Sequence, residues 1–412
     1  MPTFAAMSRP SSASLFPPLV NAVVQALQAI FMEGRYADKV IEQALRADRR
    51  RGARDRAFIA GHTYEVVRWY RLLCAALGEE PGTEAGWYRL FGAHWVLQGG
   101  SLPPWREFAG LDAAQIRAQR DEALTRRALA ASIPDWLDEL GQSELGEGWA
   151  PALAALNQPA PLVVRVNTLL TDKAAAAAAL AQAGAVVREL PGAALLLEER
   201  MNLFQSDVFQ RGWVEVQDYS SQQVALFSDV EPGMRVVDAC AGAGGKTLHL
   251  AALMENKGQL IALDTEDWKL QELRRRARRA GVHVAETRLI DTAKVVKRLH
   301  GQADRVLLDA PCSGIGVLRR NPDAKWKLSA DFIARITDLQ ADILGRYSRM
   351  CKPGGKLIYA TCSILPGENE RQVEAFLSGE AGQGFELEAM QTLLPQDEGF
   401  DGFFMARMRQ KE

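Results

Sequence analysis

The sequence has no long apolar run and few cysteines. No stretch of about 20 apolar residues occurs in its 412 residues, which argues against a transmembrane helix. The N-terminal segment MPTFAAMSRPSSASLFPP has no continuous apolar region of the kind found in secretory signals. The five cysteines are scattered without a C-x-x-C pair, so neither a zinc knuckle nor a disulfide framework is indicated. We therefore expect a cytoplasmic protein with reduced thiols, no membrane association and no metal.

The sequence also lacks an excess of either charge. Lys and Arg together number 49, Asp and Glu 51, and the net charge is -2. The total charge therefore gives no sign of a nucleic-acid partner, although basic residues do gather locally in three clusters. The clusters are Arg46, Arg49, Arg50, Arg51, Arg54 and Arg56; Arg274, Arg275, Arg276, Arg278 and Arg279; and Arg319, Arg320, Lys325 and Lys327. Each is either a solvated helix face or part of a phosphate-binding surface.

The first third of the chain has the periodicity of helices. Apolar residues recur three and four positions apart over residues 19–140, as in LVNAVVQALQAIF. We predict a helical domain over residues 1–145, whose last helix, in IPDWLDELG, is closed by Gly141. Its aromatic residues are expected to form the core rather than a base-stacking surface; they are Trp69, Tyr70, Trp87, Tyr88, Trp95 and Trp105.

A small α/β unit is predicted over residues 146–212. Leu162–Asn167 has the composition of a strand, and Asp172–Ala183 that of an alanine-rich helix ending at Gly184. Two more apolar segments, AVVREL and AALLLEE, flank a Pro-Gly turn and are predicted to be strands.

From about Tyr219 the chain alternates between helical segments and short apolar strands. The strand candidates are MRVVDAC, GQLIALD, ADRVLLDA and GKLIYATC. Such alternation predicts an α/β fold with a parallel sheet that has helices on both faces. We therefore expect a Rossmann-like catalytic domain over residues 213–412, with a binding site at the turn after its first strand.

That turn is rich in glycine and matches three kinds of nucleotide-binding loop incompletely. A Walker P-loop fits Gly245-Lys246-Thr247 but would need Gly at Cys240. A dinucleotide-binding loop would need Gly at Thr247. A loop for S-adenosylmethionine requires only small residues and free backbone N–H groups. The candidate residues for it are Cys240, Ala241, Gly242, Ala243, Gly244, Gly245 and Lys246.

Carboxylates follow the next three strands. Asp264 ends the segment LIALD, Asp291 lies in RLIDTA, where the third strand should end, and Asp309 ends VLLDA. The carboxyl ends of parallel strands meet at one edge of a sheet, so the three side chains should face the same crevice. Each alone suits a helix N-cap equally well, but together they favour the ribose and adenine of a bound cofactor.

Two cysteines, Cys312 and Cys362, lie just beyond strand ends on this same side. The other three, Cys74, Cys240 and Cys351, are interpreted as small apolar residues. A thiolate that adds to carbon 6 of cytosine activates carbon 5 for methylation. Asp309 is placed to stabilise the charge that develops on the ring. The residue chemistry alone leaves Cys312 and Cys362 as equal candidates for the attacking thiol.

At these residues the chain resembles the Nop/Sun family of RNA cytosine carbon-5 methyltransferases. The pairing of DAPCSG with TCS is far more specific than the Gly-rich loop. The matching segments are Val164–Thr168, Val216–Gln222, Asp309–Trp326, Tyr359–Glu370 and Asp401–Phe404. A weaker similarity at Ala53–Phe58 suggests that the helical domain is a NusB-like RNA-binding domain.

The resemblance implies a role for each candidate residue. Cys362 becomes the nucleophile and Cys312 the thiol that assists release, while the loop and the three aspartates bind S-adenosylmethionine. Two positions depart from the family pattern. Relatives carry Ala-Pro at Gly242-Ala243, and losing that proline adds up to about 1 kcal/mol of ordering entropy. Lys269 stands where relatives often carry Arg.

The expected activity is methylation of carbon 5 of a cytosine in 16S ribosomal RNA by a monomeric enzyme. Three alternatives stay open: a transfer RNA methyltransferase, a DNA methyltransferase in which Cys312 attacks, and a catalytically weak RNA-binding assembly factor. The small α/β unit and the basic clusters are expected to hold the RNA phosphates.

Overall fold

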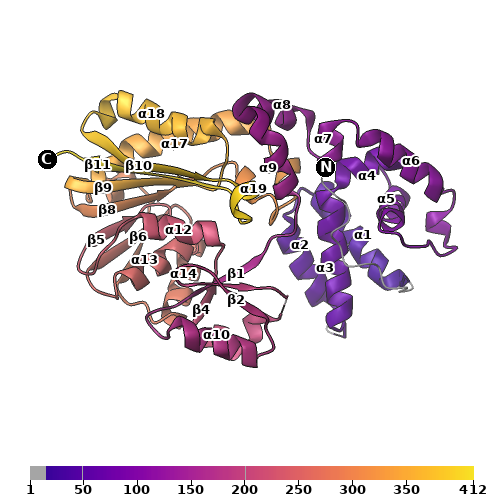
Figure 1. Cartoon of the computed structure of the whole chain (residues 1–412), viewed down its shortest axis with the longest axis horizontal. Coiled ribbons are helices and arrows are strands. Elements are labelled where there is room, and N and C mark those ends of the chain that lie inside the picture. The colour runs from indigo at the N-terminus through magenta and orange to yellow at the C-terminus, as the bar shows by residue number, and fades with distance from the viewer. Residues whose placement is uncertain (1–14, 49, 200) are drawn as a thin grey trace. The chain divides into compact units, whose positions relative to one another are not determined.

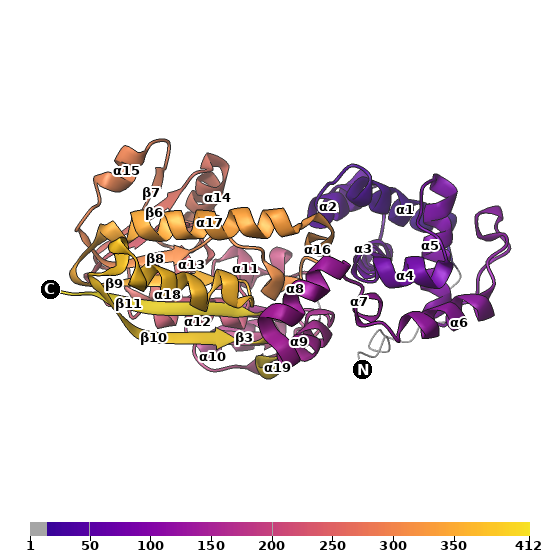
Figure 2. The ribbon, with the colours of Figure 1, turned by 90° about the horizontal axis from the view of Figure 1, so that it is seen from above.

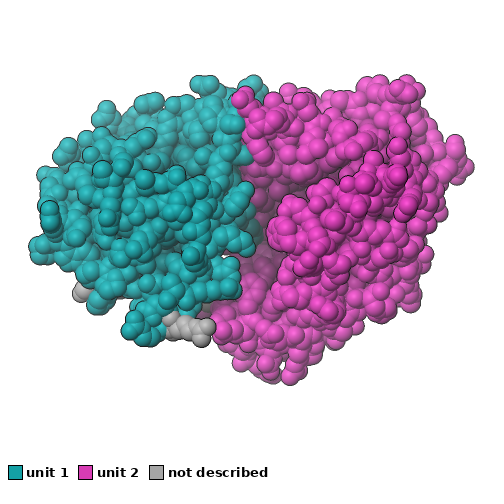
Figure 3. Space-filling model, turned by 180° about the vertical axis from the view of Figure 1, so that it is seen from behind, with its two compact units in different colours: residues 1–159, 318–330 teal, residues 160–317, 331–412 magenta. Residues whose placement is uncertain are grey.

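The computed structural model describes residues 15–48, 50–199 and 201–412. Arg49, assigned above to the first basic cluster, and most of the N-terminal segment lie outside the described residues. The chain divides into two compact units, coloured separately in Figure 3. Unit 1 comprises residues 1–159 and 318–330, and unit 2 comprises residues 160–317 and 331–412. In the described part of the chain no helix is long and apolar enough to cross a membrane.

Unit 1 is helical, as predicted (Figure 1). Its helices are α1 (Pro17–Phe31), α2 (Ala37–Ala47), α3 (Ala53–Arg68), α4 (Tyr70–Leu77), α5 (Glu84–Leu97), α6 (Ala113–Ala123), α7 (Arg127–Ala130), α8 (Asp135–Leu145), α9 (Trp149–Leu156) and α16 (Ala324–Lys327). The apolar face of α1 is buried among α2, α3 and α5. The predicted aromatic core is confirmed, because Trp69, Trp87 and Trp95 are buried in the hydrophobic core of unit 1, and Tyr70, Tyr88 and Trp105 are partly buried and pack against it.

One predicted helix end is wrong. Helix α8 continues through Gly141 to Leu145. A Cβ atom at Gly141 would lie 2.2 Å from the indole of Trp149. Glycine therefore serves here for close packing of α8 against α9 rather than as a helix stop.

Residues 318–330 pack into unit 1 although both their chain neighbours belong to unit 2. Trp326 Nε1 donates to the carbonyl of Val67 at 2.8 Å, and Lys325 Nζ donates to that of Arg68 at 2.7 Å. Lys325 is only 2% exposed and Arg319 5%. The prediction that this third basic cluster contributes to a phosphate-binding surface is therefore wrong for these two residues, which are hydrogen-bonded inside the unit.

The predicted small α/β unit forms a four-stranded antiparallel sheet in the order β2-β3-β1-β4. Its elements are β1 (Leu162–Val166), α10 (Lys173–Gln182), β2 (Val187–Glu189), β3 (Ala194–Leu197), α11 (Asp207–Gln210) and β4 (Val214–Val216). Asp172 caps α10, and Gly184 follows it with a φ of +90°. The strand β4 lies beyond residue 212, the boundary that the sequence suggested.

The second sheet has seven strands in the order β10-β11-β9-β8-β5-β6-β7. The strands are β5 (Arg235–Asp238), β6 (Gln259–Asp264), β7 (Ala285–Leu289), β8 (Ala303–Asp309), β9 (Cys351–Thr361), β10 (Phe385–Leu393) and β11 (Phe403–Gln410). Strands β5 to β9 are parallel, as predicted. The sheet is not wholly parallel, because β11 runs antiparallel to both of its neighbours, β9 and β10. Only the short helix α19 (Pro395–Glu398) connects β10 to β11, and a parallel connection requires a longer crossover.

Helices cover both faces of this sheet. Figures 1 and 2 show α12 (Tyr219–Phe227), α13 (Gly245–Leu253) and α14 (Asp267–Arg279) on one face; α15 (Ala293–Lys297), α17 (Ala330–Tyr347) and α18 (Glu370–Ser378) pack on the other. Alternate strand residues face the two helical layers: Val236 and Leu260 pack with α12 to α14, whereas Val237 and Ile261 pack on the opposite side. This two-sided burial explains why the strands are apolar throughout.

Candidate active site

The Gly-rich loop joins β5 to α13 and has the conformation that its glycines permit. Gly242 and Gly244 have φ values of +53° and +90°, which disfavour any residue with a Cβ atom. A Cβ atom at Gly244 would also lie 2.6 Å from Leu273 Cγ, so this position permits the close approach of α14. At Gly242 and Gly245 a Cβ atom would meet nothing within 4 Å. The loop backbone is therefore accessible to a ligand at these two positions.

The predicted carboxylates follow neighbouring strands. Asp264 ends β6 and accepts hydrogen bonds from the backbone N–H groups of Gly242 and Glu266, both at 2.9 Å. It thereby fixes the loop while lying at its side. Asp291 is exposed and comes two residues after β7, slightly later than predicted. Lys269 forms a 2.6 Å ion pair with Glu266.

Asp309 ends β8 and pairs with the lysine of the loop. The distance between Lys246 Nζ and Asp309 Oδ2 is 2.6 Å; the Lys246 side chain is largely buried and that of Asp309 is partly buried. Burial lowers the pKa of Lys246, but the charge and hydrogen bond of Asp309 outweigh it and leave this pKa above its ordinary value. Lys246 also interacts electrostatically with Cys362. The site therefore holds a fixed positive charge near this thiol.

The two predicted cysteines are adjacent. Cys312 Sγ lies 3.4 Å from Cys362 Sγ, and both thiols are free. Cys362 directly follows β9, and Cys312 lies three residues beyond β8. The hydrogen bond to Cys362 and burial hold the pKa of Cys312 well above its ordinary range. Burial and this hydrogen bond therefore favour the protonated form of Cys312.

A buried carboxylate that the sequence interpretation missed connects the two cysteine loops. Glu368 is 1% exposed and accepts hydrogen bonds from the serine after each cysteine. Ser313 N donates at 2.7 Å and Ser363 Oγ at 2.6 Å, while Gln340 Nε2 from α17 donates at 3.0 Å. Only the matching segment Tyr359–Glu370 pointed to this region, and nothing in it distinguished Glu368.

A second missed residue is Asp238, at the end of β5. It is 1% exposed, and burial raises its pKa from 3.8 to about 7. Its Oδ2 atom accepts a hydrogen bond from Thr247 Oγ1 at 2.6 Å, whereas its Oδ1 atom has no partner in the described part of the chain. The Thr247 that suggested a P-loop thus anchors α13 to β5.

The small sheet also supports the loop. Arg165, in β1, is 2% exposed and donates to Gln217 Oε1 at 2.6 Å and to the carbonyl of Gly245 at 3.0 Å. Arg276, in α14, donates to the carbonyl of Ala243 at 2.8 Å. The Val164–Thr168 segment therefore has a structural role beside the loop.

Cys240 lies within the loop, and burial raises the pKa of its thiol. It packs against the core together with Ile290. In the described ranges no group of three or more His, Cys, Asp or Glu side chains could hold a metal ion.

Comparison with known proteins identifies the family. Residues 225–409 match the family model "16S rRNA methyltransferase RsmB/F", and residues 133–203 match a ferredoxin-like domain of RsmF/B-like methyltransferases. The chain is 36% identical to a probable ribosomal RNA small subunit methyltransferase B of Synechocystis sp. over 299 residues, which cover 68% of this chain and 67% of the relative. It is also 36% identical to ribosomal RNA small subunit methyltransferase B of Vibrio cholerae, over 73% of this chain and 69% of the relative.

The fold has a counterpart among solved structures. A methyltransferase homolog protein from Pyrococcus horikoshii is 27% identical, with a TM-score of 0.62, and the match covers 70% of this chain and 99% of that chain. These similarities confirm the Rossmann-like fold and the predicted family resemblance. The chain belongs to the RsmB/F family of 16S ribosomal RNA methyltransferases.

Proposed function

We propose that this chain transfers a methyl group from S-adenosylmethionine to carbon 5 of a cytosine in RNA, through a covalent bond between Cys362 Sγ and carbon 6. The observation that carries the proposal is the pair of free thiols, 3.4 Å apart, beside the ion pair of Lys246 and Asp309. All four residues lie at the carboxyl edge of adjacent strands, where the Gly-rich loop also lies. Methylation of carbon 5 needs such a nucleophile because the unmodified ring reacts poorly.

The residues of the loop and its neighbours fit S-adenosylmethionine. A cationic sulfonium and an α-amino group suit a site that has several carboxylates and a buried, unpartnered Asp238 Oδ1 atom. The backbone is open at Gly242 and Gly245, and the first turn of α13 presents free N–H groups. We assign the cofactor to residues 240–246 together with Asp264, Lys269, Asp291 and Asp309. When bound, it supplies an electrophilic methyl group.

The chain's own residues prepare the base for that methyl group. The Cys362 thiolate adds to carbon 6, forming the S–C bond and moving an electron pair onto the ring. Lys246 stabilises the thiolate before attack. As the electron pair reaches the ring nitrogen, Asp309 delivers to that nitrogen the proton that Lys246 donates to it, so that no net negative charge builds up on the ring; the proton returns by the same route on release.

Cys312 has its role after methylation. The largest causes of its raised pKa are the hydrogen bond that its S–H donates to Cys362 and burial, and the Cys362 charge adds to them. Once Cys362 is bound to carbon 6, its hydrogen bond and charge are removed, so the pKa of Cys312 falls. Cys312 then loses its proton to solvent and, as a thiolate, takes the proton from carbon 5; the electron pair of that C–H bond forms the ring double bond, the S–C bond breaks, and Cys362 leaves as a thiolate.

Two substitutions test this division of roles. Cys362→Ala is expected to abolish transfer of labelled methyl groups to RNA. Cys312→Ala is expected to accumulate a covalent protein–RNA adduct, seen as a shifted band in a denaturing gel. Cys351→Ala, a buried cysteine remote from the loop, is the control and should give neither result.

The opposite pattern would contradict the proposal. Activity that survives Cys362→Ala but not Cys312→Ala would make Cys312 the nucleophile, as in the DNA methyltransferase alternative. No transfer by the wild-type chain at saturating cofactor would favour an RNA-binding assembly factor instead.

We further propose that the substrate is 16S ribosomal RNA and that the enzyme acts as a monomer in the cytoplasm. The names of the relatives support ribosomal rather than transfer RNA. A NusB-like helical domain (residues 1–145) and the small α/β unit (residues 146–212) would bind the RNA, and residues 213–412 would perform catalysis. Bisulfite mapping of cellular RNA with and without the protein tests this: a lost 5-methylcytosine in transfer RNA, with ribosomal RNA unchanged, would refute the assignment.

A further inference from the structure

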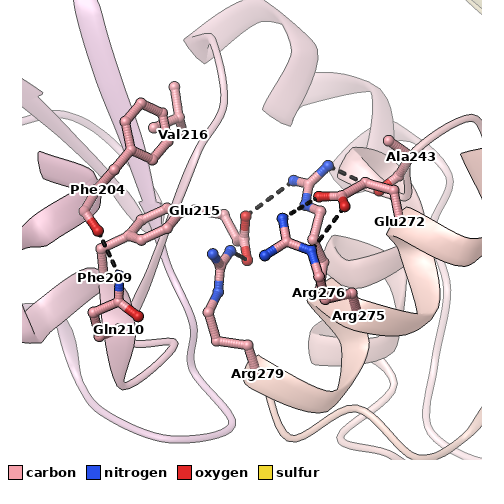
Figure 4. Close-up of a pocket in the computed structure, with 10 residues that line it drawn as sticks. All are labelled: Phe204, Phe209, Gln210, Glu215, Val216, Ala243, Glu272, Arg275, Arg276 and Arg279. Atoms are coloured by element: carbon pink, nitrogen blue, oxygen red, sulfur yellow. Dashed lines mark hydrogen bonds and ion pairs between the residues drawn. The ribbon is translucent and has the colours of Figure 1, made fainter. Parts of the chain in front are cut away.

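A pocket lies between the small sheet and α14, outside the thiol site formed by Cys312, Cys362, Lys246 and Asp309 (Figure 4). Its volume is about 490 Å³. One wall comes from Phe204, Phe209 and β4, and the other from three arginines of α14, as Figure 4 shows. Ala243, a residue of the Gly-rich loop, also lines the pocket. The pocket therefore adjoins the Gly-rich loop but contains neither thiol.

The arginines of this pocket are held in different ways. Arg276 and Arg279 both pair with the buried carboxylate of Glu215, the former at 2.9 Å. The Arg279 guanidinium also lies 3.9 Å from the centre of the Phe209 ring, and its Nε atom has no hydrogen-bond partner in the described residues. Two cations thus share one carboxylate, so the inner wall keeps an excess of positive charge. This excess of charge suits an anion, and a guanidinium group binds a phosphate through two N–H donors.

The outer part of the pocket combines an exposed cation with an exposed aromatic ring. Arg275 is 65% exposed and pairs at the surface with Glu272, an interaction that contributes little in water. Phe204 is 60% exposed, and its ring meets the Phe209 ring edge-on at 4.9 Å between centres. An exposed phenyl ring beside arginines is the combination with which proteins bind single-stranded nucleic acid, by stacking a base and holding its phosphate.

We propose that this pocket binds one nucleotide of the RNA substrate, with its phosphate on Arg275 and Arg279 and its base stacked on Phe204. The inference rests on the proposed function, because it places a nucleotide that is not the methylated one beside the loop. Arg276 connects the pocket to that loop through its hydrogen bond to Ala243. The nucleotide bound here therefore positions the strand relative to the thiol site.

The test measures RNA binding directly, by fluorescence anisotropy of a labelled single-stranded oligonucleotide and the full chain. Phe204→Ala is expected to weaken binding at least about fivefold, the lower range for loss of one stacked base. Arg275→Ala is expected to weaken it by a similar factor and to reduce the salt dependence by about one phosphate contact. Both side chains are exposed, so the fold should be retained, and a thermal melt checks this.

The matched control is Arg278→Ala. Arg278 is an exposed arginine of the same helix that does not line the pocket, so its loss reports only the general effect of one positive charge. Equal effects of Arg275→Ala and Arg278→Ala, together with an unchanged affinity of Phe204→Ala, would overturn the proposal. Adenosine monophosphate as a second probe separates a free nucleotide site from an RNA subsite: competition at micromolar monophosphate would overturn the assignment to RNA.

A measurement of methyl transfer distinguishes a failure of this proposal from a failure of the proposed function. If the wild-type chain binds RNA with the predicted pattern but transfers no methyl group, the pocket stands and the activity fails. If transfer occurs and the variants bind and react like wild type at limiting RNA, the activity stands and the pocket fails.

Discussion

Glu368 organises the thiol site without touching the reacting atoms. Its carboxylate accepts hydrogen bonds from both cysteine loops and from α17, and its backbone carbonyl accepts one from Tyr359 at 2.7 Å. A buried carboxylate with these donors fixes the separation of the two thiols. It is a positioning residue, because its effect reaches the substrate through Cys312 and Cys362.

Glu368→Gln should therefore slow methyl transfer by more than its loss of folding stability would explain. The amide presents a donor where Ser313 or Gln340 already donates, so one hydrogen bond is lost and the loops separate. We expect a loss of about 2–4 kcal/mol in unfolding free energy by chemical denaturation, and a pH profile of methyl transfer that shifts because Glu368 also raises the pKa of Cys312. Glu370→Gln, two residues away, is the control; a profile identical to wild type in Glu368→Gln would contradict the positioning role.

Asp238 should give the protein a specific pH dependence. Its folded pKa, about 7, is raised above the ordinary value of 3.8 by burial, so the folded state retains a proton that the unfolded state loses. Its contribution to stability is therefore full below about pH 4 and is lost as the pH rises to about 7, at up to roughly 1.4 kcal/mol per pH unit.

The measurement compares wild type with Asp238→Asn by urea denaturation from pH 4 to 8. The amide does not titrate and can still accept the hydrogen bond of Thr247. We expect the variant to gain stability relative to wild type as the pH rises. A constant difference between the two across this range would show that Asp238 is ionised throughout.

At the scale of the element, the Gly-rich loop depends on two adjacent glycines for opposite reasons. Gly244 has a φ of +90° and lies against Leu273, whereas Gly245 begins α13 beside open space. A methyl group added to the first must displace α14. One added to the second meets nothing.

Gly244→Ala is thus expected to lower the unfolding free energy by about 2–4 kcal/mol, from backbone strain and overpacking. Gly245→Ala should leave it unchanged or raise it by up to about 1 kcal/mol, because alanine favours the helix. Denaturation curves of the two variants check the signs. Calorimetric titration with S-adenosylmethionine should show weaker binding for both, since the methyl group of Gly245→Ala occupies the open side of the loop; unchanged affinity in that variant would place the cofactor elsewhere.

For the molecule as a whole, residues 318–330 make unit 1 discontinuous in sequence, because they belong to unit 1 but lie between two segments of unit 2. This segment leaves the Cys312 loop, packs into unit 1 and returns as α17 of unit 2. Arg68 and Trp326 secure it, through hydrogen bonds to the carbonyls of Arg319 and Val67. Unit 1 therefore lacks part of its core when the chain is cut after residue 159.

A fragment of residues 1–159 should accordingly melt at a lower temperature than the same fragment with a peptide of residues 318–330. The peptide binds only the folded fragment, so the stabilisation should increase with its concentration. A peptide with Trp326→Ala is the control and should stabilise less. Equal melting temperatures with and without the wild-type peptide would show that the segment adds nothing to unit 1.

Much of this architecture follows from the sequence because the signals are local. The apolar segments of β5, β6, β8 and β9, which alternate with helical segments, specify parallel strands between helices, and their final residues necessarily meet at one edge. The same pattern placed Asp264, Asp309, Cys312 and Cys362 together. It did not reveal β10 and β11 as an antiparallel pair, because strand direction depends on the length of the connection and on neighbours remote in sequence.

Motif spacing alone was enough to predict the family, the Gly-rich loop and the two cysteines. Which polar residues are buried depends instead on how distant segments pack together. Lys325 reads as a surface charge yet hydrogen-bonds inside unit 1, and Glu368 reads as an ordinary surface acid yet connects the cysteine loops. Burial and partners across hundreds of residues arise from packing, which local composition does not specify.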